Sequence, residues 1–420
     1  MTAGSEKRNS GPSICLVAHF AYGAMAGGYF GHIGGVERQT SLMAKWFAAH
    51  GHRVSMLTWD EGQEDEVEID GVRIIKMCRR NAGLPGLRFF WPRWTSLNAA
   101  MRRADADIYY QNCAEHVTGQ VAMWCRRHGR KLIYSVASDP DCDVRLPEMR
   151  KLRDRVLYRY GLRHADRIIV QTQRQQDMLR EGFKRNSVKV PMPCVALPEA
   201  ESRSDHIPSG DTKRVLWIGR VCKVKRPDRL LELARRCPDM VFDFVGPSGE
   251  TTYARDIVGR AESIPNLNVY GPASRNEVSR FYRQADLMCC TSDFEGFPNT
   301  FLEAWSHGLP IVSTFDPDGL IADKGLGIAV NDVSELAAGL QKLLDSPEQL
   351  QHASRTAREY YLANHTVDVA MAKFEQIFMD VFPGGGESLL EGESRNERGD
   401  THGRAICTRD CGRSSLERLR

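Results

Sequence analysis

Short apolar runs alternate with amphipathic stretches along most of the chain. The apolar runs have the length of buried strands, and the stretches between them repeat apolar positions at helical spacing, as in Leu230, Leu231 and Ala234. This alternation is typical of parallel sheets with helices on both faces, the α/β class. It predicts strands at 13–18, 53–58, 73–77, 107–110, 131–136 and 167–171, and again at 213–218, 241–245, 267–270, 286–290, 310–314 and 327–330.

The length of the chain indicates two domains, because 420 residues exceed what one hydrophobic core usually holds. A Pro-rich polar stretch separates the two halves. The boundaries that follow are a polar, disordered N-terminus (1–12), an N-terminal Rossmann-like domain (13–195), a linker (196–211), a C-terminal Rossmann-like domain (212–365), a C-terminal helix (366–382) and a charged, disordered tail (383–420).

Charge and cysteine usage narrow the function classes. A formal net charge of +3, with both signs spread throughout, does not indicate a nucleic-acid binder. The 12 cysteines are scattered, which fits a reducing cytoplasm, and Cys407 and Cys411 lack the two further ligands of a metal site. The first residues have no apolar signal-peptide core, and no stretch is long enough to span a bilayer. We therefore expect a cytoplasmic protein.

Two carboxylates, Glu295 and Glu303, stand eight positions apart around a Gly-Phe-Pro turn. The apolar run before them predicts a buried strand, and Pro298 at a first helical position predicts a helix that starts in the turn. Free N–H groups at a helix start favour a diphosphate. Glu303, inside the helix, would then accept hydrogen bonds from a ribose diol, and Glu295, at the carboxyl end of the strand, would reach a sugar. A solvated helix face is the alternative interpretation.

Two further segments carry candidate chemistry. The apolar run 213–218 ends in Gly219, and Arg220 and Lys225 follow, so that two cations would stand at the carboxyl end of a strand and neutralise a diphosphate. A basic surface loop is the alternative. In the first half, Gly34-Gly35-Val-Glu leads into an amphipathic run, and glycines at a helix start let the backbone approach a ligand closely. A plain turn is the alternative there.

Together these segments resemble the Glu-x7-Glu, Gly-Arg-x4-Lys and Gly-Gly-x-Glu motifs of the retaining GT-B glycosyltransferases of family 4. The resemblance covers residues 13–382 and is strongest over 213–314. It implies a GT-B fold, in which two facing Rossmann-like domains have a catalytic cleft between them, and a nucleotide-diphosphate-sugar donor. By this resemblance the catalytic residues are Glu295, Arg220 and Lys225. The implied donor-binding set is Gly35, Gly219, Arg220, Lys225, Gly271, Glu295, Gly296, Phe297, Pro298, Asn299, Thr300 and Glu303.

One segment departs from the family pattern. Family members commonly carry a His after the strand at 131–136, where this chain reads Ala137-Ser138-Asp139. Ser138 or Asp139 would take over the hydrogen bond to the sugar, or the acceptor pocket is built differently; Gly34, Ser138 and Asp139 are the acceptor candidates. The carboxylates Asp139, Asp141 and Asp143 suggest a metal site, but Asp-Pro-Asp also makes a good turn. Since the family that this chain resembles needs no bound metal, we expect neither a metal nor a cofactor.

The sequence therefore predicts a metal-independent, hexosyltransferase-like enzyme that moves a sugar with retention to an acceptor hydroxyl, in polysaccharide or glycoconjugate biosynthesis. A GT-B nucleotide-sugar epimerase, a sugar phosphorylase and a catalytically inactive sugar- or partner-binding scaffold are the alternatives. The stretch 84–94 interleaves aromatic and basic residues. It suits a lipid-linked acceptor and peripheral contact with the inner face of a membrane, or a hydrophobic loop packed on its own domain.

Overall fold

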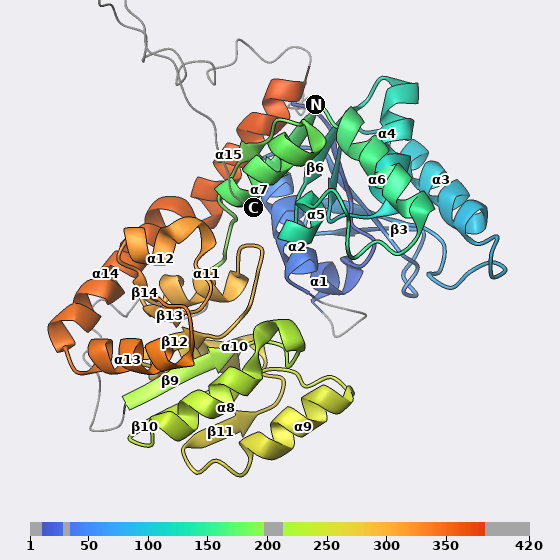
Figure 1. The fold of residues 1–420 in the computed structure, drawn as a ribbon. Helices are drawn as coiled ribbons and strands as arrows, with labels where there is room; N and C mark the ends of the chain where they lie inside the picture. Colours follow the sequence, from blue (N-terminus) through green and yellow to red (C-terminus); the bar gives the residue numbers. More distant parts are fainter. Residues whose placement is uncertain (1–10, 28–33, 197–212, 383–420) are drawn as a thin grey trace, which may run out of the picture. The chain divides into compact units, whose positions relative to one another are not determined.

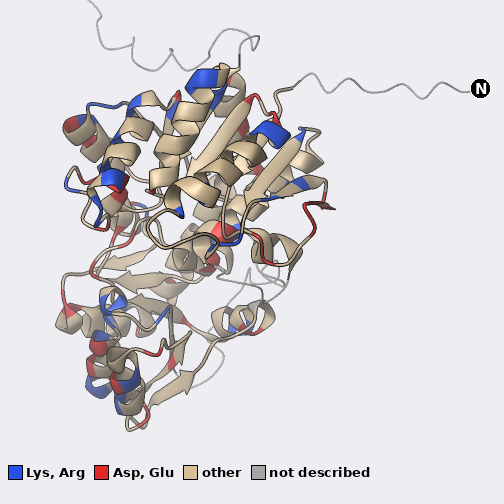
Figure 2. Ribbon diagram, turned by 90° about the vertical axis from the view of Figure 1, so that its right-hand side faces the viewer, with Lys and Arg blue, Asp and Glu red and all other residues tan. Residues whose placement is uncertain are grey.

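Two β-sheets organise the chain, one in each half, and helices cover both faces of each (Figure 1). The computed structural model describes residues 11–27, 34–196 and 213–382. The predictions for the linker, for the tail and for nearly all of the N-terminal segment therefore lie outside the described residues. Basic and acidic residues are both spread along the described ribbon (Figure 2), as expected from the small net charge.

The first sheet has eight strands in the order β3-β4-β2-β1-β5-β6-β7-β8. All neighbours are parallel except β3, which pairs with β4 in the antiparallel sense. Residues of β1 alternate between two hydrophobic clusters, one on each face, as expected for a central strand buried on both sides. The strands are β1 (Ile14–Val17), β2 (Val54–Thr58), β3 (Glu66–Ile69), β4 (Val72–Lys76), β5 (Ile108–Asn112), β6 (Lys131–Ser135), β7 (Arg167–Val170) and β8 (Val188–Lys189).

Helices connect the parallel strands of this sheet. Their buried residues recur at helical spacing, and α4 ends at Gly129, whose left-handed backbone (φ 64°) is favourable for glycine. The helices are α1 (Tyr22–Ala26), α2 (Gly35–Ala49), α3 (Thr95–Ala104), α4 (His116–His128), α5 (Asp139–Cys142), α6 (Leu152–His164) and α7 (Gln173–Met178), with the π-helical segments η1 (Phe89–Trp94) and η2 (Leu179–Phe183).

The second sheet has six parallel strands in the order β11-β10-β9-β12-β13-β14. Its strands are β9 (Lys213–Ile218), β10 (Met240–Val245), β11 (Leu267–Tyr270), β12 (Leu287–Cys290), β13 (Ile311–Ser313) and β14 (Gly327–Ala329). Its helical elements are η4 (Lys223–Lys225), α8 (Pro227–Arg236), α9 (Thr252–Ala261), α10 (Arg275–Gln284), α11 (Asn299–Ser306), η5 (Pro317–Gly319), α12 (Leu320–Asp323) and α13 (Val333–Leu344).

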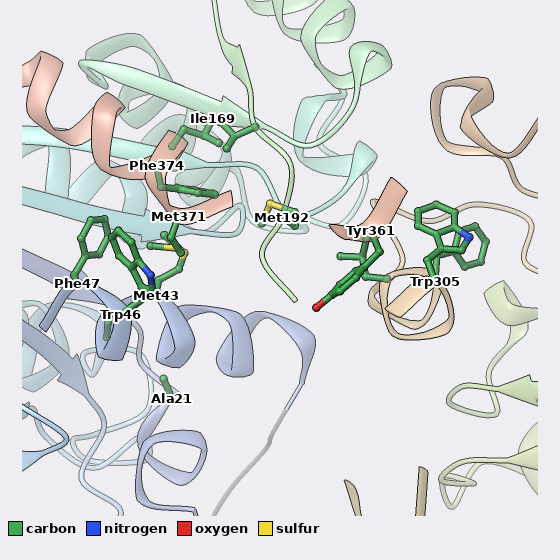
Figure 3. Packing of buried hydrophobic residues seen from close by; sticks show 14 of the residues in the cluster. Ala21, Met43, Trp46, Phe47, Ile169, Met192, Trp305, Tyr361, Met371 and Phe374 are labelled. Carbon is green, nitrogen blue, oxygen red and sulfur yellow. The ribbon is translucent and has the colours of Figure 1, made fainter. Parts of the chain in front are cut away.

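The last two helices, α14 (Pro347–Asn364) and α15 (Val367–Val381), lead the chain back to the first sheet. The indole N–H of Trp46 on α2 donates to Asp368 at 2.8 Å, and the rings of Phe47 and Phe378 lie 4.9 Å apart. Figure 3 shows Trp46, Phe47, Met371 and Phe374 in this cluster. The returning helix therefore belongs to the core of the N-terminal half.

The predicted α/β class with two parallel sheets is confirmed. Each of the twelve predicted strands overlaps an observed one, and β3 and β8 were not predicted. Each sheet also contains a point where the strand order reverses, between β1 and β5 in the first and between β9 and β12 in the second. Ligands of open α/β sheets bind outside the carboxyl ends of strands at such points. The loops after these four strands are therefore the places to look for a site.

Candidate functional site

At the reversal point of the second sheet, the loops after β9 and β12 bring Lys225 and Glu295 together. Lys225 lies in η4, and its ammonium forms an ion pair with the carboxylate of Glu295, which follows β12. Ser292 Oγ donates a second hydrogen bond to Glu295 Oε1 at 2.6 Å. Two residues 70 positions apart, predicted independently from two motifs, thus form one charged pair at the site.

Hydrogen bonds between the same loops hold this pair in place. Thr291 Oγ1 donates to the carbonyl of Lys225 at 2.7 Å, and the Asp293 N–H donates to the carbonyl of Val224 at 2.9 Å. Arg226 adds ion pairs to Asp228 at 2.7 Å and to Asp293 at 3.2 Å. These contacts fix the backbone on both sides of the pair, so Lys225 is positioned before any ligand binds.

Helix α11 begins just after Glu295. Pro298 is the residue before the helix, with an extended backbone (φ −68°, ψ 119°), and not the first helical residue as predicted; the ring of proline suits both positions. The first turn contains Asn299 and Thr300, and its N–H groups have no carbonyl partner within the helix. Such a helix start favours an anionic ligand.

Glu303 lies in the second turn of α11, as predicted, and its side chain is half-buried. Tyr282 Oη on α10 donates to Glu303 Oε2 at 3.0 Å and to the carbonyl of Thr300 at 3.3 Å. The Ser306 hydroxyl donates to the carbonyl of Glu303 at 2.7 Å. The carboxylate is therefore held by neighbouring elements of the same half.

Gly296 lies against the segment that follows β6. A Cβ at this position would meet the carbonyl oxygen of Ala137 at 2.5 Å, so only glycine permits the approach. The N–H of Phe297 donates to Gln171 Oε1, which follows β7, at 2.9 Å. The segment after β6, where the resemblance leads one to expect a His, therefore borders the loop that carries Glu295.

Ser138 and Asp139, the two predicted replacements for that His, both have structural partners. Ser138 caps the short helix α5, and its hydroxyl donates to Asp141 at 3.3 Å. Asp139 accepts from Gln175 Nε2 at 3.1 Å and pairs with Arg174 at 3.1 Å. Their role toward an acceptor stays a prediction.

The three carboxylates of this segment do not converge. Asp141 accepts the N–H of Ala137 at 2.9 Å, and Asp143 pairs with Arg145 at 2.7 Å, whereas Asp139 faces α7. Burial raises the pKa of Asp141 to about 6. Across residues 11–27, 34–196 and 213–382 no group of three His, Cys, Asp or Glu is arranged to hold a metal ion.

The remaining predicted donor residues lie at the ends of β9 and β11 and at the start of α2. Gly219 and Arg220 directly follow β9, and Arg220 is exposed. A Cβ at Gly35, the first residue of α2, would meet Asn299 Nδ2 at 2.6 Å, so the starts of α2 and α11 adjoin. Gly271 follows β11, and its carbonyl accepts the N–H of Gly246, which follows β10, at 3.3 Å. Its role toward a donor stays a prediction.

Gly34 precedes α2, and its N–H donates to Glu37 Oε2 at 2.8 Å. The glutamate of the Gly-Gly-x-Glu segment therefore satisfies one of the free N–H groups at the start of this helix. Its carboxylate also lines a pocket at the reversal point of the first sheet.

That pocket contains polar groups that were not predicted from the sequence. His19 follows β1, Asn112 ends β5, and Glu115 precedes α4. His19 Nδ1 lies 4.0 Å from Glu115 Oε2. Both polar atoms of the Asn112 amide, and Nε2 of His19, are buried without a hydrogen-bond partner among the described residues. Buried polar groups rarely stay unpaired, so this pocket has hydrogen-bonding capacity for a ligand.

The electrostatics of the pocket are acidic. Burial, together with the charges of Glu37 and Asp141, raises the pKa of Glu115 to about 7. Burial and the nearby His116 and Arg93 lower the pKa of His19 to about 3, so its imidazole is neutral at pH 7. A group rich in hydroxyl donors suits such a site better than an anion does.

Solved structures of known proteins have the same arrangement of two sheets. Sucrose-phosphate synthase of Thermosynechococcus elongatus superposes with a TM-score of 0.71 at 20% identity, covering 88% of this chain and 99% of that one. HepE of Anabaena, solved with UDP and glucose, superposes with a TM-score of 0.68 at 15% identity, covering 87% and 99%. The predicted GT-B fold is confirmed.

Family profiles decide the family. The profile described as Glycosyl transferase 4-like domain matches residues 34–194, and the one described as Glycosyl transferases group 1 matches residues 198–360. The chain belongs to the GT-B glycosyltransferases of family 4. A D-inositol 3-phosphate glycosyltransferase of Mycolicibacterium smegmatis is 30% identical over 236 residues, which are 51% of this glycosyltransferase and 54% of that protein. The chain spans about half the length of the curated relatives it matches.

Proposed function

We propose that this glycosyltransferase moves a sugar from a nucleotide-diphosphate-sugar donor to an acceptor hydroxyl, with retention of configuration at the anomeric carbon. The observation that carries the proposal is the Lys225–Glu295 pair beside the start of α11, at the reversal point of the second sheet. A fixed cation and free helix N–H groups suit a diphosphate, and a carboxylate beside them suits the hydroxyls of a sugar. The solved HepE structure that this chain resembles in fold contains UDP and glucose.

In this proposal the basic residues assist departure of the diphosphate. The bond between the anomeric carbon and the diphosphate oxygen breaks, and Lys225 and Arg220 stabilise the negative charge that develops on that oxygen. The acceptor oxygen forms its bond to the anomeric carbon on the same face, and its proton passes to the departing diphosphate. Glu295 positions the sugar, Glu303 accepts hydrogen bonds from the ribose, and no covalent sugar–enzyme bond is invoked.

The acceptor is assigned to the pocket of the first sheet. Asn112 and Glu115 supply hydrogen-bond acceptors at the carboxyl end of β5, and Glu37 adds a second carboxylate to the lining of the pocket. Hydroxyl groups of a sugar, free or linked to a lipid, satisfy these groups. This fits a cytoplasmic step in polysaccharide or glycoconjugate synthesis, and the family assignment disfavours the epimerase, phosphorylase and scaffold alternatives.

A donor panel tests the proposal. Purified protein is incubated with UDP-, GDP- and ADP-sugars, with and without candidate acceptor sugars, and release of the nucleoside diphosphate is measured. We expect one nucleotide class to be consumed, turnover to persist in excess chelator, and NMR of the product to show the donor's anomeric configuration. Consumption of no donor contradicts the transferase, an inverted product contradicts retention, and loss of turnover that a divalent ion restores contradicts metal independence.

A further inference from the structure

The segment from Leu84 to Trp91 exposes four large apolar side chains within eight residues. Leu84 is 67% exposed, Leu87 62%, Phe90 56% and Trp91 66%. Single exposed apolar residues are ordinary on a protein surface, but a contiguous group of them marks an interaction site. The alternative interpretation of this stretch, a hydrophobic loop packed on its own domain, is therefore wrong for these four side chains.

The segment is nevertheless anchored to the fold. Phe89 is buried, and the guanidinium of Arg153 lies over its ring at 3.4 Å from the centroid. The Phe89 ring also contacts Trp94, with centroids 5.5 Å apart. Since Arg153 lies in the first turn of α6, these contacts hold the exposed segment beside the start of that helix.

Helix α6 continues the exposed apolar surface. Leu152 is 73% exposed and Val156 56% exposed, and the two lie one helical turn apart on the same side. The surface formed by Leu84, Leu87, Phe90, Trp91, Leu152 and Val156 is called the apolar face below. Its residues come from two separate parts of the chain, so it is a feature of the folded domain.

The two segments that form the apolar face are rich in basic residues. Residues 79–94 contain four arginines and no acidic residue, and residues 145–163 contain seven Lys or Arg against Glu148 and Asp154. Lys151 and Arg159 on the α6 side are exposed, and Arg88 on the other side is half-buried. No helix within the described ranges is long and apolar enough to cross a membrane.

We propose that the apolar face docks on the surface of a membrane that contains anionic phospholipids. Aromatic and aliphatic side chains that stand out from the fold settle among the headgroups, and the surrounding arginines and lysines attract the lipid phosphates. The excess of positive charge around the face is what favours an anionic bilayer over an apolar groove on another protein. The proposal goes beyond the transferase function and stands on the surface alone.

Co-sedimentation of the full chain with vesicles tests the proposal. Vesicles of phosphatidylcholine are compared with vesicles that also contain phosphatidylglycerol, at low and high salt. We expect binding to the anionic vesicles, weakened by salt. The apolar variant Leu87→Ser/Trp91→Ser and the α6 variant Val156→Ser should each lower the partition constant, the first by about tenfold or more. The basic variant Arg88→Gln/Lys151→Gln should lower it by about fivefold per residue.

Matched controls lie in the other half of the chain. Leu362→Ser removes an apolar side chain that is 46% exposed on α14, and Arg255→Gln/Lys342→Gln removes two exposed cations. Both should bind vesicles like the wild type. No sedimentation with anionic vesicles at low salt, or equal losses in the control variants, overturns the proposal. So does a concentration-dependent dimer that the apolar variant abolishes, because the face is then a protein interface. Donor consumption without vesicles separates each of these outcomes from failure of the transferase.

Discussion

The two reversal points differ in whether their polar side chains have hydrogen-bond partners. In the second sheet, Lys225 and Glu295 already satisfy each other, and Ser292 and Thr291 hold them. In the first sheet, the Asn112 amide is buried without a partner in the described part of the chain. Charged groups that already pair with each other are held in fixed positions. Buried polar groups without a partner can form hydrogen bonds with a ligand. The comparison therefore supports the proposed placement of the charged diphosphate at the second sheet and of a neutral, hydroxyl-rich ligand at the first.

The sign of the local charge points the same way. Near β12 a lysine lies beside the start of α11, whereas near β5 burial and the charges of Glu37 and Asp141 raise the pKa of Glu115. A diphosphate placed near β5 would meet like charge. A diphosphate is therefore expected at the second reversal point and not at the first.

The largest effect is expected at the cations of the second sheet. Lys225→Ala and Arg220→Ala should each lower turnover by about 10²–10³-fold, because the charge they offset grows as the diphosphate leaves. Lys223→Ala, an exposed lysine in the same short helix, is the matched control and should turn over like the wild type. Steady-state kinetics with the preferred donor measure all three. Wild-type turnover in both Lys225→Ala and Arg220→Ala would mean that neither cation acts on the departing diphosphate.

The second prediction concerns the contact between Gly296 and Ala137. Gly296→Ala places a Cβ 2.5 Å from a backbone carbonyl, so one of the two segments must shift. Overpacking of this kind should lower the free energy of unfolding by about 1–3 kcal/mol, measured by urea denaturation. Gly259→Ala in α9, where a Cβ meets nothing within 4 Å, should instead stabilise the protein by about 0.5–1 kcal/mol. Equal effects of the two substitutions would mean that the segments are not in contact.

Most of the fold could be predicted because buried parallel strands appear in the sequence as short runs of apolar residues. The two missed strands lack that signal: β3 alternates exposed and half-buried residues at the edge of its sheet, and β8 has two residues. Because β3 was not predicted, its antiparallel pairing with β4 at the edge of the otherwise parallel first sheet was not predicted either. Helix α11 starts one residue after the predicted position, since proline is equally acceptable before the helix and in its first turn.

The two candidate sites differ in how far the sequence could reveal them. Glu295 and Glu303 lie within one short segment, so a local motif discloses both. His19 and Asn112 are far apart in the chain, and their meeting depends on β5 pairing with β1, which no local pattern specifies. Their polar character at the ends of two apolar runs was the one available signal.

The smallest effect is expected at Glu115. Its pKa in the folded protein, about 7, lies above the ordinary value of 4.5, so stability is lost as the pH rises through 7 and the carboxyl ionises. Glu115→Gln removes this loss of stability, so it should raise Tm at pH 8 and change it little at pH 5. The expected rise is roughly 2–4 °C, because solvent screens the charge of a partly exposed carboxylate and reduces the effect. Glu262→Gln on the surface of the second half is the control. A shift of the same size at both pH values would remove ionisation as its cause.

Calorimetric titration of a nucleoside diphosphate tests the division between the two reversal points most directly. The probe is whichever of UDP, GDP and ADP binds the wild type most tightly, titrated into the wild type, Glu303→Ala and Asn112→Ala. Loss of a charged hydrogen-bond acceptor should cost Glu303→Ala about 1.5–3 kcal/mol of binding free energy, and Asn112→Ala should bind the nucleotide like the wild type. Unchanged affinity in Glu303→Ala, or an equal loss in Asn112→Ala, would contradict the assignment of the donor to the second sheet.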